Sequence, residues 1–541
     1  MNSPDQTSRT RRKGAPAKPV AFVGAGPGDP GLLTVRGAAL LAAADVVVHD
    51  AGVAPAVLAL ARPDAELISA DCGDDGLPLA HAARAKLAVD AAKCGATVVR
   101  LVEGDPGLFG GLGEEASACL RAKVPFEVVP GVSAFTAAPT HAGFPLTAAH
   151  DHDVRIVDAS GPPVDWAAHA RPHVTLVLSG VGDRLDSVAA ALIAAGRAPG
   201  TPVAATRAAT TTAQQTVVST LDRIAADVRA ARLTGPSVVV VGEVVALREK
   251  LSWFETKPLF GWRVLVPRTK EQAGVLSDRL RAFGAVPEEV PTISVEPPRT
   301  PQQMDRAIQG LVSGRYLWVA FTSVNAVRAV REKFEEYGLD ARAFAGVKVA
   351  AVGGQTAAAL QAFGVQPDLV PTGDQSAHGL LEDWPPFDPD LDPIDRVFLP
   401  RADIATETLA EGLVSLGWEI DDVTAYRTVR AAPPAAEIRE AIKGGGFDAV
   451  VFTSSSTVRN LVGIAGKPHA RTVIACIGPA TAKTAEEHGL RVDVLAGQPA
   501  MDTLATALAE FGDTQRLEAL ASGERVWRPS QRRGGSRRKA T

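Results

Sequence analysis

Cysteine is scarce in this sequence, and its spacing argues against two kinds of site. The 541 residues include four cysteines, which are scattered along the chain: Cys72, Cys94, Cys119 and Cys476. Because no pair has C-x-x-C spacing, we expect buried small side chains rather than a zinc site or a disulfide framework. The segment from His150 to Asp153 has no further ligand at suitable spacing. We therefore expect a solvated loop there and no metal site.

Long apolar runs are also absent. No segment approaches the roughly 20 apolar residues that a membrane-spanning helix needs. Residues 1–18 are polar and basic, without the apolar stretch of an export signal, so we expect a cytoplasmic protein that does not contact a membrane. The net charge of −5 argues against a general nucleic-acid binder.

The chain is long enough for several domains, since 46% of its 541 residues are hydrophobic. Its two ends differ from the rest in composition. Residues 1–18 are expected to form a disordered basic arm, and residues 511–541 a basic tail that is mostly disordered. A nucleic-acid role for these ends is an alternative, and it predicts binding that depends steeply on salt.

The C-terminal half contains the same strand-to-helix patterns twice. The segment Tyr316-Leu-Trp-Val-Ala-Phe-Thr-Ser323 returns as Phe447-Asp-Ala-Val-Val-Phe-Thr-Ser454. Two further patterns return in the same order: Val264-Leu-Val-Pro-Arg268 as Val397-Phe-Leu-Pro-Arg401, and Ala350-Ala-Val-Gly353 as Ala475-Cys-Ile-Gly478. The repeated order predicts two related α/β units, each with three strand-to-helix turns.

These turns have the chemistry of anion-binding sites. Backbone N–H groups, the positive end of the helix dipole and hydroxyl side chains point the same way where a helix begins. We expect substrate contacts from Thr322, Ser323, Gly353, Thr453, Ser454, Ser455, Gly478 and Thr481. Simple helix capping by the hydroxyl groups is the alternative. Arg268 and Arg401 end matched strands, where they would clamp carboxylates or form surface salt bridges.

The N-terminal half has three glycine-bearing loops, each after a predicted strand. The first begins at Gly24, and the others contain Glu103-Gly-Asp-Pro-Gly107 and Pro130-Gly-Val-Ser-Ala134. A glycine-rich turn after a strand is a weak sign of dinucleotide binding. Pro30 lies where a phosphate-binding helix needs free N–H groups, which disfavours that interpretation.

Together these loops resemble those of the uroporphyrinogen-III C-methyltransferase family, part of the tetrapyrrole methylase superfamily. The likeness covers residues 19–255. It implies two α/β subdomains with S-adenosylmethionine in the cleft between them, against Pro27, Gly104, Asp105, Ser133 and Ala134. It also implies that Asp50 is a proton acceptor, a role that a carboxylate at the end of a strand can perform.

The sequence departs from this family at several basic residues. The family's Gly-Lys falls near Ala70-Asp-Cys72, and its Lys-Gly-Gly-Asp-Pro-Phe corresponds to Val102-Glu-Gly-Asp-Pro-Gly107. Its Phe-Gly-Arg-Gly corresponds to Phe109-Gly-Gly-Leu112, and its Pro-Leu-Thr-His-Arg corresponds to Pro145-Leu-Thr-Ala-Ala149. Each lost contact with a polyanionic substrate is worth about 1.5–3 kcal/mol. Two alternatives follow: a degenerate domain in which S-adenosylmethionine binding is vestigial, and a fully bifunctional protein that makes precorrin-2.

Residues 263–510 resemble uroporphyrinogen-III synthase through the repeated Phe-Thr-Ser pattern, the glycine turns and Val423-Thr-Ala-Tyr-Arg-Thr428. A linker of residues 256–262 would join this half to the first. The resemblance implies an α/β fold with parallel sheets in two lobes: lobe 1 from residues 263–289 and 432–510, and lobe 2 from residues 300–421. Residues 291–297 and 422–430 would form the hinge.

The synthase resemblance implies cyclisation of hydroxymethylbilane with inversion of its last ring, without a metal or an organic cofactor. Tyr426 matches a family tyrosine proposed to assist loss of the hydroxyl group, and packing at the hinge is its alternative role. The expected partners are tetrapyrrole substrates, hydroxymethylbilane synthase and, for the methylase half, a second copy of itself. A two-lobed regulatory protein that binds a ligand is a different class of function, and incubation with hydroxymethylbilane discriminates between them.

Overall fold

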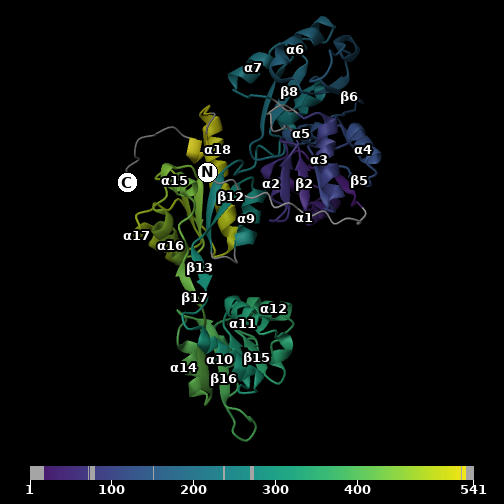
Figure 1. Ribbon diagram of the computed structural model, residues 1–541. Coiled ribbons are helices and arrows are strands. Elements are labelled where there is room, and N and C mark those ends of the chain that lie inside the picture. The colour runs from purple at the N-terminus through teal and green to yellow at the C-terminus, as the bar shows by residue number, and fades with distance from the viewer. Residues whose placement is uncertain are drawn as a thin grey trace, which may run out of the picture. The chain divides into compact units, whose positions relative to one another are not determined.

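The computed structural model describes residues 17–70, 72, 79–149, 152–235, 238–268, 273–524 and 527–531. Contacts divide the chain into two units, Met1–Trp262 with Ala282–Val286 and Arg263–Arg281 with Pro287–Thr541. Each unit is built on two five-stranded sheets (Figure 1). The expected α/β class is confirmed. Among the described residues, no helix is both long and apolar enough to span a membrane.

The first sheet of the N-terminal unit is parallel and has the strand order β3-β2-β4-β1-β5. Successive residues of β1 belong to two separate cores, because Phe22 packs on one face of the sheet and Val23 on the other. The elements are β1 (Val20–Gly24), α1 (Val35–Ala43), β2 (Val46–His49), α2 (Pro55–Leu58), β3 (Glu66–Ser69), α3 (His81–Lys93), β4 (Val98–Val102), α4 (Leu112–Arg121) and β5 (Phe126–Val129).

The second sheet of this unit is mixed and has the order β6-β7-β10-β8-β9. Strands β6 and β7 are parallel, whereas the other neighbours are antiparallel. Its elements are α5 (Ala134–Ala142), β6 (Asp153–Asp158), β7 (Val174–Ser179), α6 (Leu185–Ala194), β8 (Pro202–Arg207), β9 (Gln215–Thr220), α7 (Ile224–Ala230), β10 (Val238–Val241) and α8 (Arg248–Leu251). The unit thus consists of two α/β subdomains.

Lobe 1 of the C-terminal unit is built on the sheet β12-β11-β18-β19-β20. Strand β11 comes from the start of this unit, yet it pairs in parallel with β18 from the last third of the chain. The elements are β11 (Arg263–Arg268), α9 (Ala273–Ala282), β12 (Val286–Pro291), α15 (Ala436–Gly444), β18 (Ala449–Phe452), α16 (Ser455–Ala465), β19 (Val473–Cys476), α17 (Pro479–Glu487), β20 (Val494–Leu495) and α18 (Met501–Ala521).

Lobe 2 is built on the sheet β13-β17-β16-β14-β15. The two segments expected to form the hinge are strands of this sheet, and they pair antiparallel from Ile293 with Arg430 to Glu296 with Arg427 (Figure 1). The elements are β13 (Ile293–Glu296), α10 (Pro301–Val312), β14 (Trp318–Phe321), α11 (Val324–Glu336), β15 (Lys348–Ala351), α12 (Gly354–Ala362), α13 (Ala377–Glu382), β16 (Arg396–Ala402), α14 (Thr408–Ser415) and β17 (Glu419–Arg430).

The two lobes repeat one another down to single hydrogen bonds. In lobe 2, Asp368 accepts from Val349 N with 2.7 Å between the atoms, and in lobe 1 Asp493 accepts from Ile474 N at 3.0 Å. Both contacts join residues 19 positions apart. The matched contacts show that the sequence repeat is also a structural repeat, with β11 and β16 exchanged between the repeating segments.

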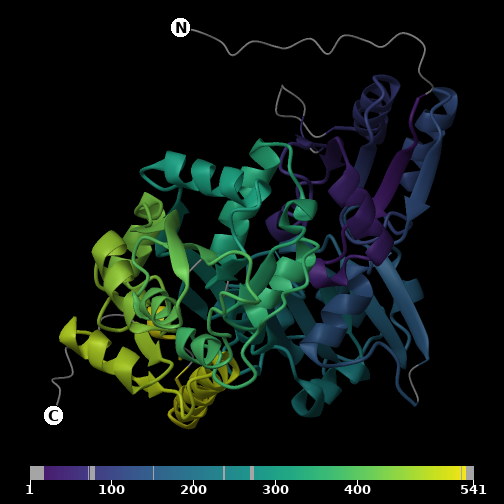
Figure 2. The same ribbon diagram turned by 90° about the horizontal axis from the view of Figure 1, so that it is seen from below.

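Two expected boundaries require correction. The expected linker is packed, since Leu259 and Trp262 are fully buried and Leu259 N donates to Phe283 O at 3.0 Å. The C-terminal domain does not end at residue 510, because α18, the yellow helix that Figure 2 shows end-on, continues to Ala521 and Ala519 is buried. The apolar positions of this helix simply continue past residue 510. Residues 1–16 and 532–541 of the expected arms lie outside the described residues.

Candidate active sites

The three glycine-bearing loops of the N-terminal unit meet at the carboxyl ends of β1, β4 and β5. Gly26 and Gly104 exchange both backbone hydrogen bonds, at 3.2 and 3.1 Å. A Cβ atom on Gly24 would lie 2.5 Å from the Cα of Gly131, so only glycine allows this approach of two backbones. Pro27 lies in the first of these loops and is partly buried. The structure therefore brings the expected cofactor loops together.

Asp105 and Ser133 fix the geometry of these loops. Asp105 accepts from Gly107 N at 2.7 Å and from Gly131 N at 2.9 Å, which ties the second loop to the third. Ser133 caps α5 by accepting from Phe135 N at 3.2 Å, and Ala134 is the first residue of that helix. Both carboxylate oxygens of Asp105 thus accept hydrogen bonds from the protein backbone and hold the second and third loops together.

The second subdomain contributes a residue that the sequence analysis missed. The hydroxyl group of Thr210 accepts from Asp29 N at 3.2 Å, which joins the first loop to the segment after β8. Thr210 is almost fully buried and has a φ of 67°, a conformation that is uncommon for threonine. Its backbone N–H donates to Gln214 at 2.8 Å, which holds this conformation. A run of three threonines at this point was the only signal in the sequence.

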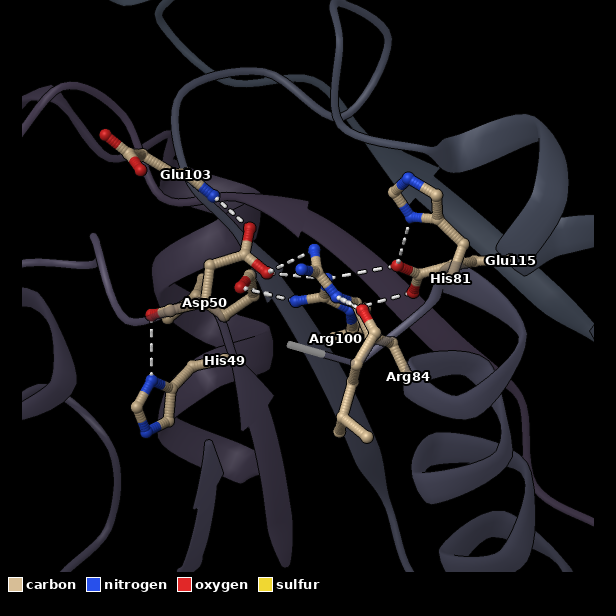
Figure 3. A network of polar contacts seen from close by, with 9 residues as sticks. His49, Asp50, His81, Arg84, Arg100, Glu103 and Glu115 are labelled. Carbon is tan, nitrogen blue, oxygen red and sulfur yellow. Dashed lines mark hydrogen bonds and ion pairs between the residues drawn. The ribbon is translucent and has the colours of Figure 1, made fainter. Parts of the chain in front are cut away.

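Asp50, the expected proton acceptor, belongs to a network of charged side chains (Figure 3). One of its carboxylate oxygens accepts from Arg100 at 2.6 Å, and the other accepts from Glu103 N at 3.0 Å. Arg100 is fully buried in β4 and also donates to Glu115 of α4 at 2.8 and 3.1 Å. Burial alone would lower the pKa of Arg100, but Glu115 and Asp50 raise it above its usual value. The carboxylate of Asp50 is therefore held in a fixed place.

Helix α3 brings two further basic side chains to this network (Figure 3). A nitrogen of Arg84 lies 4.0 Å from a carboxylate oxygen of Asp50, and Nδ1 of His81 lies 3.6 Å from Glu115. The sequence analysis missed the whole network around Asp50. One signal was available, because Arg100 interrupts an otherwise apolar strand. The lysine of the methyltransferase family falls near residues 70–72 of this chain. Ala70 is buried and Cys72 is exposed, and Asp71 lies outside the described residues.

In the C-terminal unit, Tyr426 lines a cavity of about 1050 Å³. The walls come from the hinge strands β13 and β17 and from helices α10 and α11. The hydroxyl groups of Tyr426 and Ser323 lie 3.0 Å apart, and Ser323 also accepts from Ala326 N at 3.1 Å as the N-cap of α11. Two of the expected site residues, from different elements, are therefore in direct contact. Thr322, the residue before Ser323, is partly buried.

In lobe 2, the turn between β15 and α12 is covered by a residue of the same lobe. The side chain of Gln375 accepts from Gly354 N at 2.9 Å, at the first residue of α12. A Cβ atom on Gly353 would lie 2.9 Å from the same side-chain oxygen. Gln375 therefore occupies the space in front of Gly353, which is expected to contact the substrate.

The matching turns of lobe 1 are linked to each other. Ser454 caps α16 with a reciprocal pair of hydrogen bonds to Thr457, and Thr453 directly precedes it. Ser455 donates to Ala480 O at 3.0 Å and is within 2.9 Å of the hydroxyl of Thr484, so the turns after β18 and β19 are joined. A Cβ atom on Gly478 would meet nothing within 4 Å, whereas Thr481 is buried behind it.

The two matched arginines have different environments. Arg268 pairs with Glu289 at 3.1 Å and lines the cavity that contains Tyr426. Arg401 is almost buried and donates to both oxygens of Asp422, to both oxygens of Glu407 and to Thr406 O. The hydrogen bonds that Arg401 donates to Asp422 and Glu407 outweigh the effect of burial and raise the pKa of Arg401. Each of its three guanidinium nitrogens already donates to an acceptor of the protein, which argues against the expectation that Arg401 clamps a substrate carboxylate.

Comparison with known families divides the chain in the same way. Residues 19–225 match the model of the Tetrapyrrole (Corrin/Porphyrin) Methylases, and residues 274–506 match that of Uroporphyrinogen-III synthase HemD. The Porphyrin biosynthesis protein HemD of Ruminiclostridium josui is 32% identical over 503 residues, which cover 91% of this chain and 98% of that protein. The chain belongs to this fused methylase–synthase family. It is an enzyme of tetrapyrrole biosynthesis with a methylase half and a uroporphyrinogen-III synthase half.

Other relatives match one half more closely. The Uroporphyrinogen-III C-methyltransferase of Bacillus subtilis is 37% identical over 323 residues, which cover 57% of this chain and 64% of that protein. A crystal structure of the Thermus thermophilus uroporphyrin-III C-methyl transferase, complexed with S-adenyl homocysteine, is 34% identical to the methylase half. It covers 42% of this chain and 99% of that chain, with a TM-score of 0.36. Among the described residues of both halves, no group of three or more His, Cys, Asp or Glu side chains is placed to hold a metal ion.

Proposed function

We propose that the synthase half cyclises hydroxymethylbilane to uroporphyrinogen III at the cavity lined by Tyr426. The observation that carries this proposal is the contact between the hydroxyl groups of Tyr426 and Ser323, at 3.0 Å, where Tyr426 lines a cavity of about 1050 Å³. In this arrangement the phenol donates to the departing hydroxyl group of the substrate. Ser323 then donates to the phenol oxygen and stabilises the charge that develops there.

The carboxylates of the linear tetrapyrrole are held by helix N-termini and one arginine. The turn at Gly478 has open space in front of it, and Ser455 fixes its position relative to the preceding turn. Arg268 lines the cavity and has a partly exposed side chain. Such a substrate carries its own reactivity, so the protein acts mainly by fixing its shape and stabilising charge, without a metal or an organic cofactor.

The methylase half binds S-adenosylmethionine at the three joined loops and uses uroporphyrinogen III as the methyl acceptor. The cofactor supplies an activated methyl group. The absence of a side chain at Gly104 lets a ligand approach the backbone closely, and the close contact of Gly24 with Gly131 and the hydrogen bonds of Asp105 and Thr210 hold the loops in place. Asp50 lies at the end of the neighbouring strand, where a carboxylate can receive a proton from the methylated carbon.

The experiment incubates the full chain with hydroxymethylbilane and separates the isomers of the product. We expect the type III isomer, and a Tyr426→Phe variant should form it about 100-fold more slowly because the donor to the leaving group is lost. Tyr316→Phe is the matched control, since the hydroxyl of Tyr316 is buried and donates to Asp421 at 2.6 Å in the same lobe. Formation of the type I isomer only, or equal loss in both variants, would contradict the proposal.

A further inference from the structure

Two basic side chains of α3 face the carboxylates beside the expected acceptor site. His81 is the first residue of the helix, and Arg84 lies one turn later. Figure 3 shows both side chains directed from the helix toward Glu115 and Asp50. The distances to these carboxylates are 3.6 Å from His81 to Glu115 and 4.0 Å from Arg84 to Asp50. Helix α3 therefore contributes positive charge at the strand end where Asp50 lies.

His81 fills the space in front of Gly111, in the loop that follows β4. A Cβ atom built on Gly111 would lie 2.0 Å from Cε1 and 2.1 Å from Nδ1 of His81. The imidazole ring thus stands where a side chain at position 111 would leave the backbone. Helix α3 therefore supplies the side chain at this point of the loop.

Among the described residues of this network, the basic side chains that solvent reaches are Arg84 and His81 of α3. Arg100 cannot reach a ligand, because its side chain is fully buried and its donors go to Asp50, Glu115 and Leu101 O. The side chains of Arg84 and His81 are 22% and 41% exposed. Without them, an arriving carboxylate would meet two carboxylates balanced by one arginine, and repulsion would weaken its binding.

We propose that His81 and Arg84 bind the carboxylates of the tetrapyrrole acceptor in the methylase half. This inference rests on the proposed function of that half. The backbone of Arg84 is set by α3, and its Nε donates to Leu79 O at 3.0 Å, which leaves the end of the guanidinium directed toward Asp50. The acceptor is then held over the first turns of α3 with its methylated ring beside Asp50.

The test measures methyl transfer from S-adenosylmethionine to uroporphyrinogen III by the full chain. In His81→Ala and in Arg84→Ala we expect the KM for the acceptor to rise about tenfold each, and about 100-fold in the double variant. Arg84→Lys should retain most of the binding because it keeps the charge. The KM for S-adenosylmethionine should not change. Lys86→Ala is the matched control, since Lys86 is exposed on the same helix and faces away from Arg84.

A second measurement separates this inference from the proposed function. Uroporphyrin III, the stable oxidised form of the acceptor, is titrated by fluorescence against the same variants, with calorimetric binding of S-adenosylmethionine as the control for folding. If the wild-type chain transfers no methyl group but the double variant binds uroporphyrin more weakly, the inference holds and the methyltransferase proposal fails. Unchanged acceptor binding in the double variant overturns the inference. An equal loss in Lys86→Ala, or a parallel loss of S-adenosylmethionine binding, overturns it as well.

Discussion

The strand-to-helix turns of lobe 1 and lobe 2 follow the same residue pattern, but their surroundings differ. In lobe 2, Gln375 covers the turn after β15, and Ser323 of the turn after β14 is joined to Tyr426. In lobe 1, the space in front of Gly478 is open, and Ser455 links the two turns to each other. Under the proposed function, the open turn at Gly478 in lobe 1 binds an anionic group and lobe 2 carries the tyrosine.

The matched arginines show the same divergence. Arg268 lines the cavity, whereas Arg401 is enclosed by two acidic side chains of its own lobe. Equal positions in a repeat therefore do not give equal roles. Arg268 pairs with Glu289, and Arg401 pairs with Asp422 and Glu407, so the neighbours of each side chain set how its charge can act.

The sharpest test of this difference is alanine substitution of the two arginines. Arg401→Ala should lower the free energy of unfolding by about 2 kcal/mol, because it leaves Asp422 and Glu407 without their common partner. Arg268→Ala should change stability much less but raise the KM for hydroxymethylbilane. Urea unfolding and steady-state kinetics on both variants measure this. A raised KM in Arg401→Ala at unchanged stability would restore the clamp role to Arg401.

A carboxylate placed in the open turn tests whether lobe 1 binds the substrate. Gly478 has an extended φ of −174°, so a side chain is tolerated there. Gly478→Asp should raise the KM for hydroxymethylbilane about tenfold, because the new carboxylate occupies the helix N-terminus and repels the substrate. Gly478→Ala controls for bulk, and Gly353→Asp is the matched change in lobe 2. Equal KM values for the two aspartate variants would remove the distinction between the lobes.

The two N-cap serines should differ in function but not in stability. Ser323→Ala and Ser454→Ala each remove a side-chain cap and should each lower the free energy of unfolding by about 1 kcal/mol. Only Ser323→Ala should also slow formation of the type III isomer, because Ser323 contacts Tyr426. Chemical unfolding and isomer analysis are measured on the same samples. If formation of the type III isomer slows equally in both variants, the contact with Tyr426 has no special role.

The smallest expected effect is at the residue that covers the lobe 2 turn. Gln375 is exposed, so Gln375→Ala should lower the free energy of unfolding by only about 0.5 kcal/mol. The substitution frees the N–H of Gly354 and makes this turn more similar to that of lobe 1. We expect no change in the KM for hydroxymethylbilane. A lower KM would mean that the substrate uses this turn when it is open.

The sequence by itself determined the local elements of the sites. Apolar runs that end in Thr-Ser predicted the turns after β14 and β18, because a buried strand followed by a hydroxyl N-cap is fixed by neighbouring residues. The glycine loops were predicted for the same reason, since close backbone contacts such as that of Gly24 with Gly131 require residues without a Cβ atom. The swapped arrangement of β11 and β16 followed from the family resemblance, not from local pattern.

Only the tertiary structure decided which of these groups are available. Arg401 matches Arg268 in sequence, but the return of β17 beside β16 places Asp422 against it. The covering of Gly354 by Gln375 and the approach of His81 to Gly111 likewise depend on where distant segments pack. Charge and hydroxyl groups can be read from a sequence, whereas their partners lie across the fold. Electrostatic and hydrogen-bond energies depend on those partners. The network of Asp50, Arg100 and Glu115, with its basic neighbours on α3, therefore could not be inferred from the sequence alone.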